Sequence, residues 1–296
     1  MKNYDLLVIG GGAAGMSAAL SAHESGVKSI LVVERQGWLG GVLKQCLHNG
    51  FGLGYFKEDC TGTEYAQKYI EKFSQAGINV MLDTMVIDLL PTKEAVISSE
   101  NGVEKISFDK CVLATGCRER TIGSLSISGS RPSGVFTAGT AQKMVNISSL
   151  DVGDNIVILG TGDIGQIMAR TFIQNGKNVI AMIEINDHPG GLKRNQINCI
   201  QAYNIPVIYS ATIDRIVGNK RIEGVYVKHL DTGIREFLKC DTLISALGLI
   251  PERELLSGFE TVPDWLYLCG NCDYVHDIVD SVTMQGEELG KRIANE

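Results

Sequence analysis

Two short glycine-rich stretches contain the residues whose types and spacing suggest chemistry. Gly10, Gly12 and Gly15 follow the pattern G-x-G-x-x-G, and the same pattern recurs 150 positions later. In this pattern the first glycine permits a tight turn, the second lets the backbone approach a pyrophosphate, and the third lets a helix pack closely on a strand. The N-terminus of that helix then faces the phosphates. The spacing therefore predicts two dinucleotide sites.

An acidic residue stands at the same place after each stretch. Glu34 follows Gly10 by 24 positions, and Glu184 follows Gly160 by the same interval. A carboxylate there can accept a hydrogen bond from a ribose hydroxyl. Each stretch also follows an apolar run and begins a helix-like segment. Both copies therefore have the strand, turn and helix order in which this motif binds dinucleotides. Two such sites in one chain favour a flavin beside a nicotinamide, because one can deliver hydride to the other.

The elements that must position these residues occur twice. Residues 4–41 align without a gap to residues 154–191, and each copy predicts a strand, a tight turn, a helix and a second strand. Each copy is followed by alternating apolar segments, which we expect to form an antiparallel meander, and by an apolar strand that ends in glycine. The meander segments are residues 78–82, 85–89 and 95–98, and then 206–209, 213–217 and 224–228.

The second unit is predicted to be inserted into the first. Residues 265–270 have the pattern of one more parallel strand and residues 280–294 that of a closing helix, with no third glycine motif before them. They most simply complete the N-terminal domain. We therefore expect an α/β fold of two Rossmann-like dinucleotide-binding domains of the three-layer ββα type. The first domain would comprise residues 1–117 and 247–296, and the inserted domain residues 118–246.

Composition excludes several classes of function. The chain has 296 residues, 34 of them glycine and only 6 proline, and its formal net charge is −7. A negative surface is unsuited to phosphate backbones, so we expect no nucleic-acid partner. No apolar run approaches the roughly 18 residues that span a bilayer, and residues 1–5 show no signal-peptide pattern. We expect a cytoplasmic protein whose eight scattered cysteines are reduced.

Over essentially its whole length the chain resembles the two-dinucleotide-domain flavoproteins that include thioredoxin reductase. In that superfamily an N-terminal FAD domain is split by an inserted NAD(P)H domain. The resemblance implies FAD on the Gly10 turn, with Glu34 at the adenosine ribose, and NAD(P)H on the Gly160 turn. The expected FAD contacts are Gly10, Gly12, Ala13, Ala14, Gly15, Glu34, Arg35, Gly40, Gly41, Val42, Leu43, Ala114, Thr115, Gly116, Gly270, Asn271, Val282 and Thr283. The expected NAD contacts are Gly160, Thr161, Gly162, Asp163, Ile164, Gly165, Glu184, Leu247 and Gly248.

The residues around Glu184 favour NAD over NADP. A carboxylate there repels a 2′-phosphate, and no arginine follows it directly. Lys193 and Arg194 lie a few residues further on and keep NADP as an alternative.

The disulfide reductases of this superfamily use cysteine pairs that this chain lacks. Residues 133–142, where the thioredoxin-reductase type has its C-x-x-C, contain no cysteine, and Gly40-Gly41 is followed by Cys46 alone. The remaining pair is Cys269 and Cys272. We expect no metal site, although redox-active thiols, or a metal bound by this pair with His276, are alternatives.

Five segments resemble a narrower group, the small FAD/NAD-type subunit that accompanies anaerobic glycerol-3-phosphate dehydrogenases. More distantly they resemble subunits of sarcosine oxidase, opine oxidase and hydrogen cyanide synthase. The segments are residues 40–56, 114–120, 131–142, 247–252 and 269–280. The chain departs from the narrower group at Cys272, where that group has an aliphatic residue. It departs from the superfamily at Asn271, where the superfamily has an aspartate that holds the ribityl chain of FAD.

This resemblance implies hydride transfer between NAD(H) and FAD, with electrons passed to or from a partner dehydrogenase subunit. Residues 40–43 would run along the flavin, and the helix near Asp280 would aim the backbone N–H groups of residues 282–285 at the flavin N1–C2=O edge.

Two side chains just beyond Gly41 are candidate catalytic groups. Cys46 and His48 could face the flavin as proton donor or acceptor, and His276 is a similar candidate. The alternative function is a stand-alone NADH oxidase, or a peroxide or disulfide reductase, that uses Cys46 or the pair Cys269 and Cys272. The two nucleotide-binding domains and their meanders leave no residues for a substrate domain, which favours a function in a complex.

Overall fold

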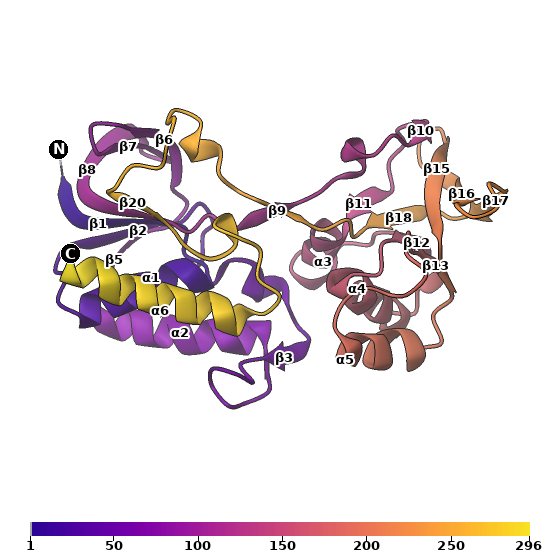
Figure 1. The fold of residues 1–296 in the computed structure, drawn as a ribbon, viewed down its shortest axis with the longest axis horizontal. Helices are drawn as coiled ribbons and strands as arrows, with labels where there is room; N and C mark the ends of the chain where they lie inside the picture. Colours follow the sequence, from indigo (N-terminus) through magenta and orange to yellow (C-terminus); the bar gives the residue numbers. More distant parts are fainter. Residues whose placement is uncertain (1) are drawn as a thin grey trace. The chain divides into compact units, whose positions relative to one another are not determined.

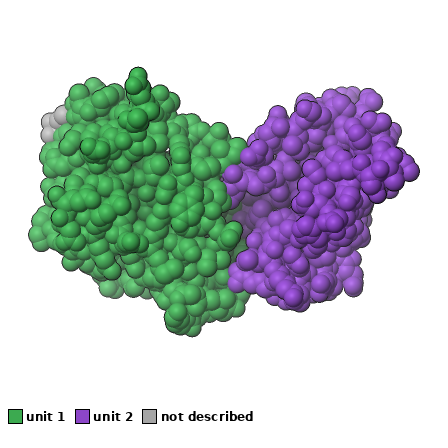
Figure 2. All heavy atoms as spheres, in the orientation of Figure 1, with its two compact units in different colours: residues 1–118, 250–296 green, residues 119–249 purple. Residues whose placement is uncertain are grey.

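The computed structural model describes residues 2–296 and divides the chain into two compact units. Unit 1 comprises residues 1–118 and 250–296, and unit 2 comprises residues 119–249 (Figure 2). The chain crosses between the units twice, at β9 (Cys117–Glu119) and β19 (Leu249–Pro251), and these two strands pair with each other. Both units have the predicted α/β architecture with a Rossmann-like parallel sheet.

Unit 1 is built on a sheet in which five strands run parallel, in the order β5-β2-β1-β8-β20. The first half of the long strand β8 also pairs antiparallel with β7, which pairs with β6. Three helices, α1, α2 and α6, lie together on one face of this sheet (Figure 1). The bounds are β1 (Asn3–Ile9), α1 (Ala13–Glu24), β2 (Ile30–Val33), α2 (Gly62–Ala76), β5 (Asn79–Met81), β6 (Met85–Leu90), β7 (Glu94–Ser99), β8 (Gly102–Leu113), β20 (Leu266–Leu268) and α6 (Val279–Asn295).

The core of unit 1 follows the alternation of β1. Leu6 and Val8 face the helices, and Leu7 and Ile9 face the layer formed by β6 and β7. All four side chains are buried, and all four are apolar because a parallel strand that is covered on both faces has no contact with water.

Unit 2 repeats the plan with a five-stranded parallel sheet, in the order β11-β18-β12-β13-β14, and a four-stranded sheet, β10-β15-β16-β17. The bounds are β10 (Ser128–Gly129), β11 (Val135–Thr137), α3 (Ala138–Asn146), β12 (Asn155–Leu159), α4 (Asp163–Gln174), β13 (Asn178–Ile183), α5 (Lys193–Asn195), a π-helical turn (Gln196–Gln201), β14 (Val207–Ile208), β15 (Ala211–Gly218), β16 (Ile222–His229), β17 (Arg235–Lys239) and β18 (Thr242–Ser245).

One prediction about the strands is wrong in both units. Residues 78–82 and 206–209 do not belong to the antiparallel meanders, because they form β5 and β14, the parallel edge strands next to β2 and β13. Alternation of apolar residues reports a half-buried strand but not its direction. The direction follows from the helical crossover before each strand, since a crossover brings the chain back parallel.

The closing helix α6 packs on α1 with almost no side-chain atoms between the two backbones. A Cβ atom added at Gly286 would lie 2.7 Å from the Ala14 carbonyl oxygen, and one added at Gly290 would lie 2.7 Å from the Ala22 nitrogen. The Ser21 hydroxyl donates to the Glu287 carbonyl oxygen at 2.7 Å. Glycine is therefore required on α6 by the close approach of the helices. Within residues 2–296 no helix has the length and apolar character needed to span a membrane.

We predict that Gly290→Ala lowers the free energy of unfolding by about 1–3 kcal/mol, the usual cost of overpacking a filled core. Alanine is intrinsically favoured over glycine in a helix by about 1 kcal/mol, so the sign of the change reports the contact with α1. Urea unfolding followed by circular dichroism measures it. Glu288→Ala, at an exposed position of the same helix, is the control and should change stability by less than about 0.5 kcal/mol. A Gly290→Ala protein as stable as the wild type would contradict the packing argument.

Candidate functional site

In unit 1 the predicted residues are brought to one edge of the sheet. Ile9 pairs with Val33 and with Leu113, and Leu113 pairs with Leu268. The strands β1, β2, β8 and β20 therefore end side by side. The residues that follow them, Gly10, Glu34, Ala114–Gly116 and Gly270, gather where ligands bind in open parallel sheets.

The three glycines of the first turn are required for different reasons. Gly10 has φ +107°, a conformation that favours glycine, and a Cβ atom there would collide with the Ala114 carbonyl. A Cβ atom on Gly15 would lie 3.0 Å from the carbonyl carbon of Gly10. Gly12 has φ −79°, and a Cβ atom there would have no atom within 4 Å. The fold thus requires the first and third glycines, whereas at the second, the N-cap residue of α1, a side chain would meet no protein atom.

The helix that begins at this turn has an unsatisfied N-terminus. No side chain caps α1, and its first turn contains no acidic residue. By contrast, α2 begins with a complete capping box of Thr61 and Glu64. The free N–H groups and the positive end of the helix dipole make the start of α1 suited to a phosphate.

Glu34 is buried at this edge, with 6% of its surface exposed. Its Oε2 accepts a hydrogen bond from the Gly11 N–H at 2.7 Å, and its Oε1 accepts one from the Gln36 N–H at 2.7 Å. A carboxylate has about four acceptor positions, so each oxygen keeps room for a hydroxyl. Arg35, the next residue, is exposed.

The segment after the second strand lies against the glycine turn. The Gly40 N–H donates to the Gly11 carbonyl oxygen at 2.8 Å, and a Cβ atom on Gly41 would lie 3.2 Å from the Gly12 Cα. Gly41 opens a short 3₁₀ helix, Gly41–Gln45, in which Leu43 is buried and Val42 is exposed. Residues 40–43 thus border the open space beside Gly12.

Unit 2 repeats the turn. Leu159 pairs with Ile183 and Ser245, so Gly160, Glu184 and the segment of Leu247 and Gly248 share an edge. Gly160 has φ +102° and its Cβ would collide with the Ala246 carbonyl, and a Cβ on Gly165 would lie 2.7 Å from the Gly160 oxygen. Gly162, with φ −62°, again has nothing within 4 Å.

The second acidic residue differs from the first. In Glu184, Oε2 accepts from the Thr161 N–H at 3.1 Å and from the Thr161 hydroxyl, and Oε1 accepts from the Asn186 N–H at 3.0 Å and the Asn186 amide at 2.9 Å. Burial raises the pKa of Glu184, but these hydrogen bonds outweigh burial and hold the pKa below its usual value. All four acceptor positions of the Glu184 carboxylate are filled, so its hydrogen bonds connect the glycine turn at Thr161 to Asn186. A ribose hydroxyl would have to displace one of the four donors.

Two polar side chains of α4 fix the loop that follows β13. Asp163 Oδ1 accepts from the Leu192 N–H and the Asn195 amide, both at 2.7 Å. Gln166, which the sequence analysis missed, donates to the carbonyl oxygens of Thr161 and Gly190 at 2.7 and 2.8 Å. Asp163 is therefore turned toward the loop and leaves the helix N-terminus uncapped. Ile164 follows in the first turn of α4 and is partly buried.

Helix α6 also begins without a capping side chain, and its position corrects one expectation. It starts at Val279 with Ile278 as N-cap residue. The first four N–H groups of a helix lack internal partners, so the free groups belong to residues 278–281. Those of residues 282–285 lie within the hydrogen-bonded helix. The Thr283 side chain is buried and accepts from the Tyr65 hydroxyl at 2.8 Å, and Val282 is partly buried.

Gln285, another residue that the sequence analysis missed, closes the loop before α6. Its Oε1 accepts from the Gly270 N–H at 2.7 Å and lies 3.1 Å from His276 Nε2, and its amide nitrogen donates to Asp273 at 3.1 Å. His276 therefore carries its proton on Nε2, because Gln285 Oε1 can only accept. Asn271 Oδ1 accepts from the His276 N–H at 3.0 Å.

The two candidate catalytic side chains are placed differently. Cys46 is buried, its thiol donates to the Val42 carbonyl oxygen at 3.4 Å, and burial raises its pKa to about 12. His48 is half-buried, with Nδ1 3.0 Å from the Asn49 carbonyl oxygen and its ring against Phe51. A thiol with so high a pKa is a poor nucleophile or proton donor at neutral pH.

The pair Cys269 and Cys272 lies wholly inside unit 1. The Cys272 thiol donates to the Leu113 carbonyl oxygen at 2.8 Å. Burial raises the pKa of both thiols, that of Cys269 to about 12. Across residues 2–296 no group of three or more His, Cys, Asp or Glu side chains is arranged to hold a metal ion. The pair behaves as small core residues.

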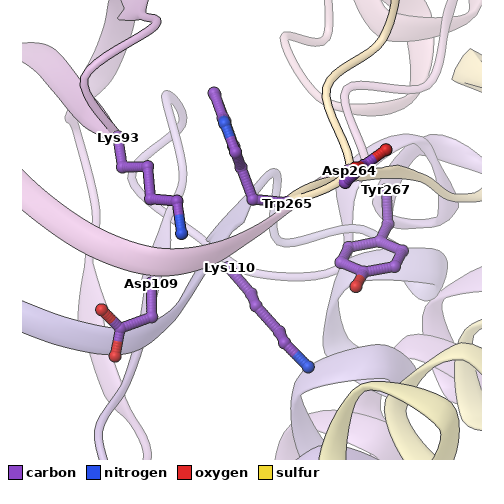
Figure 3. A pocket seen from close by; sticks show the side chains of 6 residues that line it. All are labelled: Lys93, Asp109, Lys110, Asp264, Trp265 and Tyr267. Carbon is purple, nitrogen blue, oxygen red and sulfur yellow. The ribbon is translucent and has the colours of Figure 1, made fainter. Parts of the chain in front are cut away.

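A shallow cavity of about 310 Å³ lies elsewhere on unit 1 (Figure 3). Asp109 and Lys110 line it beside the first half of β1, and Asp264 and Trp265 precede β20. This is the edge opposite the glycine turn, so the cavity is separate from the residues that gather at that turn.

Comparison with known proteins decides the family. The sequence profile of the pyridine nucleotide-disulphide oxidoreductases matches residues 4–264. The chain belongs to that family. Members of this oxidoreductase family bind FAD and NAD(P), which agrees with two glycine turns, one in each unit.

Two relatives in sequence and one solved structure cover different shares of this oxidoreductase. The 34.2 kDa protein in the rubredoxin operon of Clostridium pasteurianum is 24% identical over 272 residues, 90% of this chain and 83% of that one. Hydrogen cyanide synthase subunit HcnB of Pseudomonas protegens is 28% identical over 184 residues, 60% of this chain and 38% of that one. The fold is that of T. acidophilum thioredoxin reductase, with a TM-score of 0.80, 19% identity and coverage of 100% and 99% of the two chains.

We predict that the buried cysteines of this oxidoreductase do not react with a maleimide or a disulfide reagent in the folded protein. With a pKa near 12, about one Cys46 or Cys269 thiol in 10⁴ is ionised at pH 8. Cys117 is only half-buried and should be modified first. All eight cysteines should react after denaturation. Mass mapping of the labelled sites makes the measurement, and rapid native labelling of Cys269 or Cys272 would contradict a purely structural pair.

Proposed function

We propose that this protein transfers hydride between NAD(H) and FAD and passes electrons to or from a partner dehydrogenase subunit. One observation carries the first half of the proposal. Gly12 and Gly162 each leave room that no protein atom uses, at an uncapped helix N-terminus, once in each unit. This is the geometry that a pyrophosphate requires.

The residues of unit 1 fit FAD. The N–H groups at the start of α1 would bind the pyrophosphate, and the two free acceptor positions of Glu34 would bind the adenosine ribose. Asn271 would hold the ribityl chain through its amide, and residues 40–43 would border the flavin. FAD supplies the centre that accepts and releases hydride, and these residues bind and orient it.

The residues of unit 2 support NAD rather than NADP. Glu184 holds a buried negative charge at the end of β13, and Ile185, Asn186 and Asp187 follow it, so no cation stands where a 2′-phosphate would lie. The positive pair Lys193 and Arg194 begins α5 further along the chain.

The burial of the cysteines supports the proposal of a partner subunit. The buried thiols of Cys46, Cys269 and Cys272 are not placed to relay electrons to a disulfide, so electrons must leave the flavin by another route. HcnB, one relative, is itself named as a subunit of a synthase. We infer a complex of the glycerol-3-phosphate dehydrogenase type from the resemblance of residues 40–56, 114–120, 131–142, 247–252 and 269–280. The cytoplasmic location stays a prediction from the sequence.

Anaerobic titration tests the cofactor assignment. The purified yellow protein should be bleached by one equivalent of NADH, and more slowly by NADPH because of the charge of Glu184. Faster reduction by NADPH would reverse the choice of NAD. A protein that neither contains nor binds FAD would overturn the proposal itself.

Two matched glycine variants assign the cofactors to the units. Gly12→Ala should weaken FAD binding about tenfold or more, since a methyl group would occupy the pyrophosphate position, while binding of NADH is kept. Gly162→Ala should retain FAD and weaken NADH binding by a similar factor. Thermal unfolding of the FAD-free proteins should change little in both, because neither Cβ meets a protein atom. Loss of FAD from Gly162→Ala would exchange the assignment.

The partner is tested by turnover. The isolated chain should reduce artificial dyes with NADH but show little activity with oxygen, peroxide or disulfides, and a second chain should co-purify from the native host. Efficient turnover of peroxide or a disulfide by the chain alone would favour the stand-alone reductase.

A further inference from the structure

The antiparallel sheet of unit 2 has one face in the core and one face toward solvent. In β16, Val225 and Val227 belong to the same apolar core as Val157 of the parallel sheet. Successive side chains of a strand point to opposite faces, so Tyr226 and Lys228 point away from that core. Tyr226 is 36% exposed. The strands β15, β16 and β17 are labelled in Figure 1.

The outward side chains of these three strands form adjacent rows, because the pairing register places them side by side. One row is Arg215, Tyr226 and Phe237, and the next contains Lys228 and Arg235. We call the complete set, with the exposed residue at the end of β17, the outer face: Arg215, Tyr226, Lys228, Arg235, Phe237 and Lys239.

An aromatic pair occupies the centre of the outer face. The ring centroids of Tyr226 and Phe237 are 5.2 Å apart, and Phe237 is 47% exposed. A Cβ atom on Gly224 would collide with the Phe237 ring, so this ring lies over the backbone of β16. The fold therefore fixes the pair on the surface without covering it. Aromatic and arginine side chains of this kind are enriched at the centres of protein interfaces.

Cations surround the aromatic pair. They are Arg215, Lys228, Arg235 and Lys239. Arg235 Nε donates to the Asp214 carboxylate at 2.6 Å, and this hydrogen bond lowers the pKa of Asp214. The charges of Lys228 and Arg215 lower the same pKa further. Four cations and one bonded carboxylate make this face positive, although the chain as a whole has a net charge of −7.

The corresponding face of unit 1 carries a different set of charges. The rows across β6, β7 and β8 are Asp88, Val96 and Lys105, then Met85, Ser98 and Val103. Of these six residues Lys105 is the one cation, and its amine lies 3.9 Å from the Glu94 carboxylate. The same three-stranded layer is thus built once without a cluster of cations. The cluster in unit 2 is not a requirement of the fold.

We propose that the outer face of unit 2 is a docking surface for an acidic protein, whose carboxylates surround an apolar centre. The aromatic pair supplies the apolar contact, and the four cations match the carboxylates around it. Such complementarity selects the partner and speeds its association. This inference goes beyond the function proposed above, because it depends on the outer face and not on which cofactors the chain binds.

Other occupants fit the charges less well. A twofold interface between two copies of this chain would bring the outer face against itself and oppose four cations to four. An extended polyanion, such as nucleic acid or an anionic bilayer, would also meet the negative remainder of the chain. An acidic patch on a folded protein is limited in area, so it matches the outer face alone.

Photocross-linking in cells of the native host tests the proposal. The full chain carries a photoreactive phenylalanine analogue at Phe237, or, as the control, at Val103, which is exposed on the corresponding face of unit 1. Irradiation should join position 237 to one protein through a segment rich in Asp and Glu, and position 103 should not give this adduct. The proposal would be overturned by the absence of an adduct at position 237. It would equally be overturned by an adduct with a second copy of this chain, with nucleic acid or with a segment that lacks acidic residues.

Charge reversal then measures the contribution of the cations to binding of the cross-linked protein, purified without the photoreactive group. The double variant Arg215→Glu and Lys228→Glu should raise the Kd about tenfold or more, because repulsion replaces attraction. The Kd of the wild type should rise with salt concentration. Lys28→Glu reverses a charge at an exposed loop position of unit 1 and should keep the wild-type Kd. A double variant that binds as tightly as the wild type would contradict the docking surface.

A variant without a change of charge tests the aromatic centre. Tyr226→Ser removes one ring, while Phe237 still covers Gly224 and the sheet keeps its packing. The Kd should rise about tenfold, a typical effect of removing a central aromatic side chain. Circular dichroism and thermal unfolding check that each variant is folded. An unchanged Kd in Tyr226→Ser would show that the rings are not the centre of the interface.

Discussion

The structure depends on backbone meeting backbone around α1. On one side of this helix Gly15 approaches the Gly10 carbonyl, and on the other side Gly286 and Gly290 of α6 approach Ala14 and Ala22. Van der Waals contact between polypeptide backbones replaces the packing of large side chains at both contacts. This closeness brings the start of α1 to the carboxyl ends of β1, β2, β8 and β20. It also holds α6, with its own uncapped N-terminus, beside the same sheet edge.

The sequence predicted the parts of the fold that depend on local chemistry. The glycine turns follow from positive φ at Gly10 and Gly160, and the insertion of unit 2 follows from a duplicated pattern and a C-terminal strand. The direction of β5 and β14 could not be read from the alternation of apolar residues, which is the same in a parallel edge strand and in a hairpin. It depends on the helical crossover before each strand. The start of α6 was placed one residue late, because Ile278 lacks the polar side chain by which N-cap residues are recognised.

The site was predictable as a set of backbone positions but not as a hydrogen-bond network. Glu34 and Glu184 occupy equivalent positions, yet Glu34 keeps acceptor positions free and Glu184 has none. At Glu184 the side chains of Thr161 and Asn186 donate hydrogen bonds. At Glu34 the equivalent residues Gly11 and Gln36 contribute only their backbone N–H groups. Gln166 and Gln285 gave no signal as site residues. Each bonds to backbone or side-chain atoms of a loop beside its helix, and such contacts exist only after the chain has folded.

The strands β9 and β19, at which the chain crosses between the units, pair with each other, and this has a consequence for unit 2. The Arg120 N–H donates to the Gly248 carbonyl oxygen at 2.9 Å, and the Glu252 N–H donates to the Gly116 carbonyl oxygen at 3.0 Å. The two points at which residues 119–249 leave and rejoin the host chain are thus adjacent. A domain whose ends meet in this way can be excised or exchanged without separating the strands that it interrupts. Residues 119–249 can therefore vary as one unit while the host sheet stays intact.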